Sequence, residues 1–150
     1  MTLNQIIALI QTQSNLHKQI NKFAVGTEFD MSADPVEYYP LFWLIPSGFR
    51  PSMPDSSGAN RNIDYLFTGL LVDKTVESKA NSIEVLSDMA TVIIDISTMM
   101  GRAAISNDCE FLFNGDTQPF YDAKSDVIGG YAFDFIIRVP NQSSYCDIPT

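Results

Sequence analysis

The sequence predicts an α+β fold: a mainly antiparallel sheet of four to five strands packed against an N-terminal helix and a long central helix. Three observations indicate this class. Helical and strand periods are both clear, the strands come in runs without regular βαβ alternation, and 150 residues suffice for one core. We expect a single α+β domain over residues 1–140 and an extended C-terminal tail over residues 141–150.

The N-terminal segment predicts a helix. Thr2 and Gln5 have the spacing of a capping box. Apolar and similar residues then recur every three to four positions, as on one face of a helix: Leu3, Ile6, Ile7, Ile10, His17 and Ile20. Gly26, a few residues later, favours the end of this helix, and a short strand is expected around Ala24–Phe29.

Two strands and a long loop are predicted next. Val36–Ile45 is rich in aromatic residues, and Pro40 within it indicates an edge strand or a bulge, because proline cannot donate to a ladder. Pro46–Asn60 holds three prolines, two glycines and four serines without an apolar period, so we expect a loop that becomes ordered only in an assembly. Asn62–Asp73 alternates as a strand does.

The central helix is expected to begin near Ser78 or Ser82 and to end at Met100, because Gly101 is placed to terminate it. Two adjoining apolar rows predict that it is largely buried: Val85, Met89, Val92, Ile96 and Met100 in one, and Ile83, Leu86, Ala90 and Ile93 in the other. Its expected exposed residues are acidic: Glu84, Asp88 and Asp95.

Two further strands are predicted in the last third of the chain. Glu110–Phe113 is a short strand that a hairpin turn at Asn114–Gly115 closes, and the polar stretch that follows is expected to be irregular. Tyr131–Val139 alternates most clearly, with Phe133 and Phe135 on its core-facing row. The pair Gly129 and Gly130 resembles no phosphate-binding loop, so a bulge or close packing explains it better.

The charge of the chain argues against several partners. Nine Lys and Arg face eighteen Asp and Glu, which gives a formal net charge of −9. Affinity for nucleic acid comes mainly from basic residues, so specific DNA binding is disfavoured, and so is a membrane-surface role. Cys109 and Cys146 form no CxxC pair and are expected to be reduced thiols.

The case for an enzyme is weak, and we expect neither a cofactor nor a metal. The single histidine, His17, lies among apolar and amide residues, as a partly buried structural histidine does. A serine or cysteine nucleophile would need such a base near a signature that the sequence lacks. Two pairs of carboxylates remain as metal or paired-acid candidates. Asp64 and Asp73 are expected at opposite ends and on opposite faces of one strand, which makes them a poor pair, and Asp108 and Glu110 share a face but are explained equally well as solvated acids.

The aromatic cluster of Tyr38, Tyr39, Phe42 and Trp43 could stack on single-stranded nucleic acid. No Lys or Arg lies between Ala24 and Pro46, so packing in a core or at a subunit interface is the better interpretation.

Several short segments resemble a known family. They are Tyr38-Tyr39-Pro40, Gly69-Leu70-Leu71-Val72-Asp73, the helix Ile83–Met89, the strand Val127–Val139 and the ending Tyr145-Cys146-Asp147-Ile148-Pro149. In this order they resemble the small neck and tail-completion (tail terminator-like) proteins of tailed bacteriophages, including versions from crAss-like phages. The likeness covers most of the chain, although none of its motifs is a catalytic signature.

The resemblance implies a structural virion protein. It implies a ring of six or twelve copies at the head–tail interface or tail end, in contact with neck, portal or tail proteins, through which DNA passes without specific binding. The expected location is the virion, assembled in the host cytoplasm. The candidate interface residues are Tyr38, Tyr39, Trp43, Phe49, Arg50, Met53, Arg61, Tyr145 and Ile148. The alternative is a small phage- or bacterium-encoded adaptor or inhibitor domain that acts by protein–protein binding.

Overall fold

The computed structural model describes residues 1–27, 39–51, 62–75, 80–122 and 128–140. These residues form two helices and six strands: α1 Leu3–Leu16, β1 Lys22–Val25, β2 Leu41–Pro51, β3 Asn62–Lys74, α2 Ser82–Ser106, β4 Glu110–Phe113, β5 Gln118–Asp122 and β6 Ile128–Pro140. The class is α+β, as predicted, but the sheet has six strands where four to five were expected.

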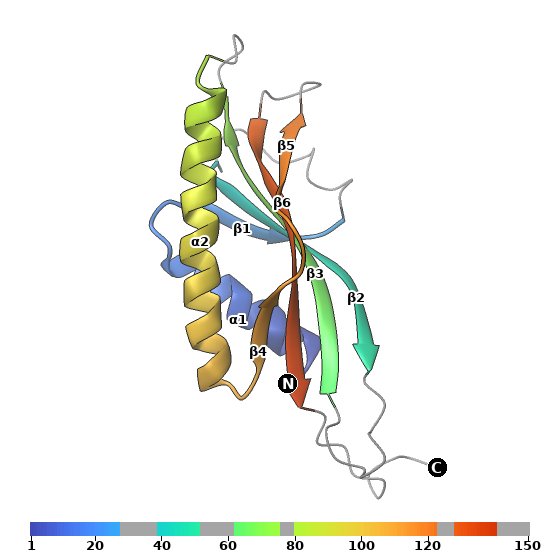
Figure 1. The fold of residues 1–150 in the computed structure, drawn as a ribbon. Coiled ribbons are helices and arrows are strands. Elements are labelled where there is room, and N and C mark those ends of the chain that lie inside the picture. The colour runs from blue at the N-terminus through green and yellow to red at the C-terminus, as the bar shows by residue number, and fades with distance from the viewer. Residues whose placement is uncertain (28–38, 52–61, 76–79, 123–127, 141–150) are drawn as a thin grey trace, which may run out of the picture.

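The six strands form one mixed sheet. Its order is β1-β2-β3-β6-β4, and β5 also pairs with β6. Only β1 and β2 are parallel among these pairs, and the long antiparallel pair of β3 and β6 forms the centre. In Figure 1, α2 runs alongside β4 and β6, whereas α1 lies behind the strands.

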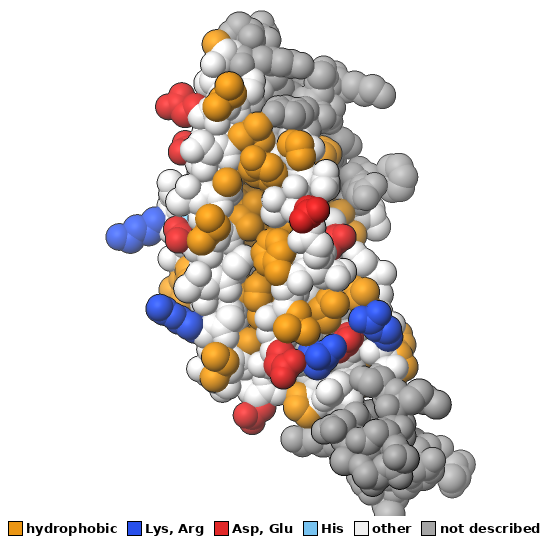
Figure 2. Space-filling view, in the orientation of Figure 1, with side chains coloured by type: hydrophobic (Ala, Val, Ile, Leu, Met, Phe, Trp, Pro, Cys, Tyr) orange, Lys and Arg blue, Asp and Glu red, His pale blue; other side chains and the backbone are white. Residues whose placement is uncertain are grey.

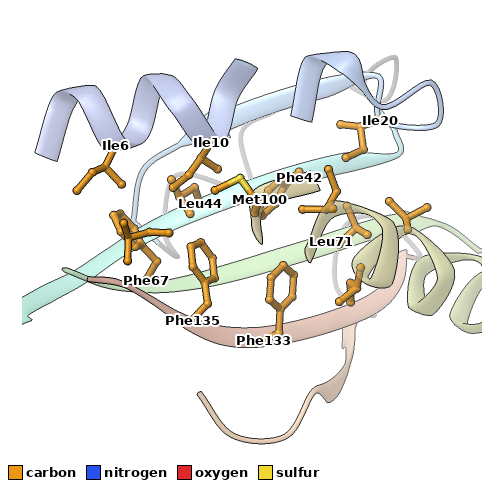
Figure 3. Packing of buried hydrophobic residues seen from close by; sticks show 14 of the residues in the cluster. Ile6, Ile10, Ile20, Phe42, Leu44, Phe67, Leu71, Met100, Phe133 and Phe135 are labelled. Atoms are coloured by element: carbon orange, nitrogen blue, oxygen red, sulfur yellow. The ribbon is translucent and has the colours of Figure 1, made fainter. Parts of the chain in front are cut away.

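Both helices pack on the same face of the sheet. One cluster of buried residues joins Ile6 and Ile10 of α1 to the apolar row of α2 and to Phe42, Phe67 and Phe135 of the sheet (Figure 3). A second cluster, of Leu41, Trp43, Leu70, Val72 and Ile128, uses the alternate residues of the same strands and therefore lies on the opposite face.

The N-terminal helix begins as predicted. The Thr2 side chain accepts from the Gln5 N–H, and the Gln5 side chain accepts from the Thr2 N–H, which completes the capping box. The helix ends earlier than its apolar period suggested, because His17 adopts an extended conformation and the backbone then turns, with Ile20 N–H bonded to the His17 carbonyl. The next strand is therefore Lys22–Val25 and begins before Ala24.

The predicted loop at 46–60 is wrong for its first six residues. Pro46–Pro51 continue β2 and pair with β3, with a register shift between Pro46 and Gly48. The prolines and the glycine gave a loop-like composition, but pairing with the long apolar strand β3 outweighs local preference. Residues 52–61 lie outside the described part. Pro40 precedes β2, and the strand has neighbours on both sides along Leu41–Leu44, so an edge position there is also wrong.

The central helix does not stop at Gly101. It runs on to Ser106, and an added Cβ at Gly101 would meet no atom within 4 Å. Gly101 therefore lies on the helix surface without breaking it. The helix ends where Asp108 takes a left-handed backbone (φ 52°) and the Cys109 N–H donates to the Ala104 carbonyl at 3.0 Å.

The strand Glu110–Phe113 is confirmed, but the hairpin after it is wrong. Both β4 and β5 pair with β6, one after the other along the same edge. Asn114 still donates to the Asp134 carbonyl at 2.9 Å, and Gly115 takes a positive φ of 95°. The turn residues therefore interrupt one edge strand, because β6 is long enough to bind both pieces.

The final strand is confirmed with the predicted orientation. Phe133 and Phe135 are both buried against the helices. Close packing explains Gly130, since a Cβ there would lie 2.0 Å from the Leu71 carbonyl oxygen.

Candidate interaction surfaces

The side chains of His17, Cys109 and Asp64 are used in structural contacts. No group of three or more His, Cys, Asp or Glu in this part could hold a metal ion. His17 is partly buried, as predicted, with its Nε2 3.4 Å from Asp95 Oδ2. The Cys109 thiol is buried, and desolvation raises its pKa, which disfavours the reactive thiolate. Cys146 lies outside the described residues.

The four candidate carboxylates do not gather. Asp64 and Glu110 belong to the charge row described next, whereas Asp73 lies at the far end of β3, where burial raises the pKa of its carboxyl group. Asp108 is exposed at the end of α2. Asp108 and Glu110 both line a cavity of 250 Å³ near Arg138.

A row of alternating charges crosses one end of the sheet. Arg50 of β2 stands opposite Asp64 of β3, Asp64 stands opposite Arg138 of β6, and Arg138 stands opposite Glu110 of β4. Figure 2 shows basic and acidic side chains next to one another in the lower part of the view. Because each of these residues is paired in register with the next, the four side chains share one face of the sheet.

The centre of the row is the buried carboxylate of Asp64, which is only 4% exposed. Arg138 Nε donates to Asp64 Oδ1 at 2.8 Å, Arg138 Nη2 donates to Oδ2 at 3.2 Å, and Arg50 Nη2 donates to Oδ2 at 3.3 Å. The hydrogen bonds from Arg138, more than those from Arg50, hold the pKa of Asp64 below its usual value against the opposing effect of burial.

The row ends differently on its two sides. Its outer members are Arg50, whose side chain is 63% exposed, and Glu110, whose side chain is 64% exposed and 3.5 Å from Arg138. β1 pairs only with Leu41–Leu44, so the outer side of Ile45–Pro51 has no neighbour among the described strands, and neither has the outer side of β4. One open edge is therefore basic and the other acidic.

The outer surface of α2 exposes several large apolar side chains. Ile83, Ile94 and Ile105 are 83%, 66% and 79% exposed, and Phe113 of the adjacent β4 is 42% exposed. Figure 2 shows apolar side chains spread along the helix and gathered between it and the strands. Exposed apolar groups that gather in this way indicate an interaction surface.

Two shallow cavities lie between α2 and β4. Each has a volume of 440 Å³. Ile93, Ile94, Ser97, Thr98, Phe113 and Thr117 line one, and the other continues along Gly101, Arg102 and Ile105 of the helix to Phe111 and Leu112 of the strand. Together they form a groove with an apolar floor, which we call the α2–β4 groove.

The structure describes four of the predicted interface residues. Phe49 is 68% exposed on β2, and Arg50 follows it in the charge row. Tyr39 is half-buried beneath the Lys74 ammonium, which lies 5.7 Å from its ring centre. Trp43 is buried in the second cluster, and its Nε1 has no hydrogen-bond partner among the described residues. The other five, Tyr38, Met53, Arg61, Tyr145 and Ile148, lie outside the described residues.

Sequence reasoning missed the exposed residues of α2. Ile83 was assigned to a buried row, and Ile105 lay beyond the predicted helix end. The signal was present, because Ile83, Ile94 and Ile105 recur every eleven residues, which is close to three helical turns and differs from the buried row. Phe113 faces the same side as the partly buried Phe111 but lies on an edge strand, which the sequence could not show.

No protein-family model and no curated protein sequence matches this chain. Within the described residues, neither helix is long and apolar enough to cross a membrane.

Proposed function

We propose that this protein is a non-enzymatic structural subunit that forms a homo-oligomeric ring at the head–tail interface or tail end of a tailed bacteriophage. The observation that carries the ring is the charge row, which ends in Arg50 at one open edge of the sheet and in Glu110 at the other. The placement in a phage particle depends on the sequence resemblance alone.

Opposite edges suit a head-to-tail contact. Such a contact joins two different patches of neighbouring copies, and it closes into a ring when the rotation between copies brings the last copy back to the first. A basic edge that meets an acidic edge favours this arrangement, whereas an edge that meets its own copy brings like charges together. The two edges of this sheet thus supply the complementary faces that a ring subunit needs.

Side chains, more than backbone bonds, would hold this contact. Pro46 and Pro51 lie in the part of β2 with an open outer edge, and proline in an edge strand has no N–H to offer an added strand. The exposed Phe49 ring lies between them and beside Arg50. It is the largest apolar group on this edge and would pack against the acidic edge of the next copy.

The overall charge fits a conduit. A net charge of −9 per copy makes an assembled ring strongly acidic, so passing DNA would be repelled from its wall. The structural use of His17, Cys109 and Asp64 supports a role without catalysis.

The test is the assembly state of the full chain, measured by native mass spectrometry at micromolar concentration with negative-stain imaging. We expect closed rings of six or twelve copies. Phe49→Ser should abolish them and leave the subunit folded by circular dichroism, because exposed substitutions change the stability of the subunit itself by about 0.5 kcal/mol at most. Leu16→Ser is the matched control, because Leu16 is 65% exposed on α1, and it should leave rings intact.

A wild-type chain that stays monomeric, even with neighbouring virion proteins present, would contradict the ring. That result would favour the adaptor or inhibitor role instead. If Phe49→Ser still forms normal rings, the ring is supported but the β2 edge that carries Phe49 is not part of its interface.

A further inference from the structure

The three exposed isoleucines of α2 form a straight stripe. Ile83, Ile94 and Ile105 are eleven residues apart, so each is displaced by only about 20° around the helix and about 16 Å along it. Serine, threonine and glycine occupy the surface between them: Ser87, Thr98 and Gly101. A second helix could therefore approach closely between the isoleucines.

The stripe is symmetric about the middle of the helix. Ile94 has twelve helical residues on either side within Ser82–Ser106, and Ile83 and Ile105 lie at equal distances from it. Two copies of α2 placed antiparallel about a two-fold axis at Ile94 would therefore bring Ile83 of each beside Ile105 of the other. A contact that uses the same patch on both copies in this way is isologous.

Charge on one flank of the stripe selects the antiparallel arrangement. By helical position Glu84 and Arg102 lie on the same flank, with the acid in the first turn and the arginine near the other end. Antiparallel helices bring this flank of both copies together and place each Arg102 near the Glu84 of the other copy, whereas a parallel two-fold contact would put the two flanks on opposite sides of the seam and form neither pair. The antiparallel arrangement also opposes the two helix dipoles favourably.

The other flank of the stripe is the α2–β4 groove. Its cavity beside Ile94 is lined by Phe113 and Thr98 and is open to solvent. In the two-fold arrangement this flank meets the same flank of the second copy, so the two α2–β4 grooves face each other across the contact. Asp95, which also lies near the middle of the helix, is held toward the end of α1 by His17.

We propose that α2 is a self-association surface: a second copy of this chain docks antiparallel on the isoleucine stripe through a two-fold contact. This contact is separate from the charged sheet edges. On the basis of the proposed ring, it would join two six-copy rings into twelve copies, and without a ring it would give a dimer. Copy numbers are therefore even in either case.

The test measures copy number and association by native mass spectrometry and analytical ultracentrifugation of the full chain. In Ile94→Glu each copy contributes one glutamate at the two-fold axis, so two like charges are buried beside each other. Because burying unpaired charge is costly, we expect the copy number to halve and association to weaken at least about 100-fold. Leu16→Glu is the matched control, with a leucine 65% exposed against 66% for Ile94, and it should leave association unchanged.

A charge exchange tests the orientation. Arg102→Glu alone should weaken the contact about tenfold, because it replaces two solvent-exposed ion pairs with two pairs of like charges. The double variant Glu84→Arg with Arg102→Glu should restore it to within about threefold. A double variant that stays as weak as the single one would overturn the antiparallel arrangement.

The outcomes separate this contact from the proposed ring. Dimers that Ile94→Glu converts to monomers support the contact and contradict the ring. Six-copy rings that Ile94→Glu leaves unchanged support the ring and overturn the contact. A wild-type monomer at all concentrations overturns both.

Discussion

The buried carboxylate of Asp64 is the residue whose charge matters most for stability. It accepts from two arginines, and its folded-state pKa lies below the value of an unfolded chain. A lowered carboxyl pKa contributes stability that is fully present above the unfolded value of 3.8 and is lost as pH falls through the folded value. Because Asp64 joins β3 to β6 and β2 through its two arginines, the stability of this part of the sheet should decrease at acid pH.

Asp64→Asn should lower the free energy of unfolding at pH 7 by about 1.5–3 kcal/mol, the range for hydrogen bonds to charged groups. The loss stays at this level because both arginine partners are partly exposed and can be hydrated. The measurement is urea denaturation of both proteins from pH 7 to pH 2. The difference between them should shrink as pH falls below about 3.8, and a constant difference would show that the ion pairs are not its cause.

Glycine has opposite roles in two of the elements. Gly130 of β6 faces the backbone of β3, where a Cβ would lie 2.0 Å from the Leu71 carbonyl oxygen, whereas Gly101 of α2 has open space around it. The same substitution should therefore act in opposite directions at the two positions.

Gly101→Ala should raise the free energy of unfolding by about 0.5–1 kcal/mol, because alanine has the higher helix propensity. Gly130→Ala should lower it by more than about 2 kcal/mol, because strand backbones must separate. Thermal unfolding in a background that carries both Ile94→Glu and Phe49→Ser removes the contributions of the two proposed contacts. Equal effects would mean that β3 and β6 are not packed as closely as described.

The strand β6 carries the aromatic centre of the core. Phe133 stacks on Phe42 at 5.9 Å between ring centres, and Phe135 stacks on Phe67 at 5.3 Å. Phe133→Ala or Phe135→Ala should cost about 3–5 kcal/mol, whereas Asp88→Asn on the exposed side of α2 should change stability by less than about 0.5 kcal/mol. Chemical denaturation of the three variants measures this. A phenylalanine variant as stable as Asp88→Asn would contradict the register of β6.

Elements with strong periodicity were predictable from sequence, and elements set by their neighbours were not. The capping box at Thr2 and the alternation of β6 each follow from residues close in the chain. Pro46–Pro51 and Gln118–Asp122 have polar, proline-containing sequences, and they are strands because β3 and β6 are long enough to bind them. Pairing with a partner far along the chain leaves no local signal.

At the scale of the whole molecule, the candidate surfaces were only partly predictable. Phe49 and Arg50 are exposed, in agreement with an interface role, whereas Trp43 is buried. Whether a side chain of β2 points to solvent depends on which face each neighbouring element covers, and the sequence alone does not fix this. The charge row likewise exists only because four strands are in register.

The position of β6 has a consequence for synthesis on the ribosome. It is the last described strand, and it binds β3 along its whole length as well as β4 and β5. Until β6 emerges, β4 and β5 of the nascent chain lack the strand with which they pair, and one side of the long apolar strand β3 is unpaired. Such intermediates are prone to aggregate, so this chain should depend on chaperones during translation and should complete its sheet only after β6 has left the exit tunnel.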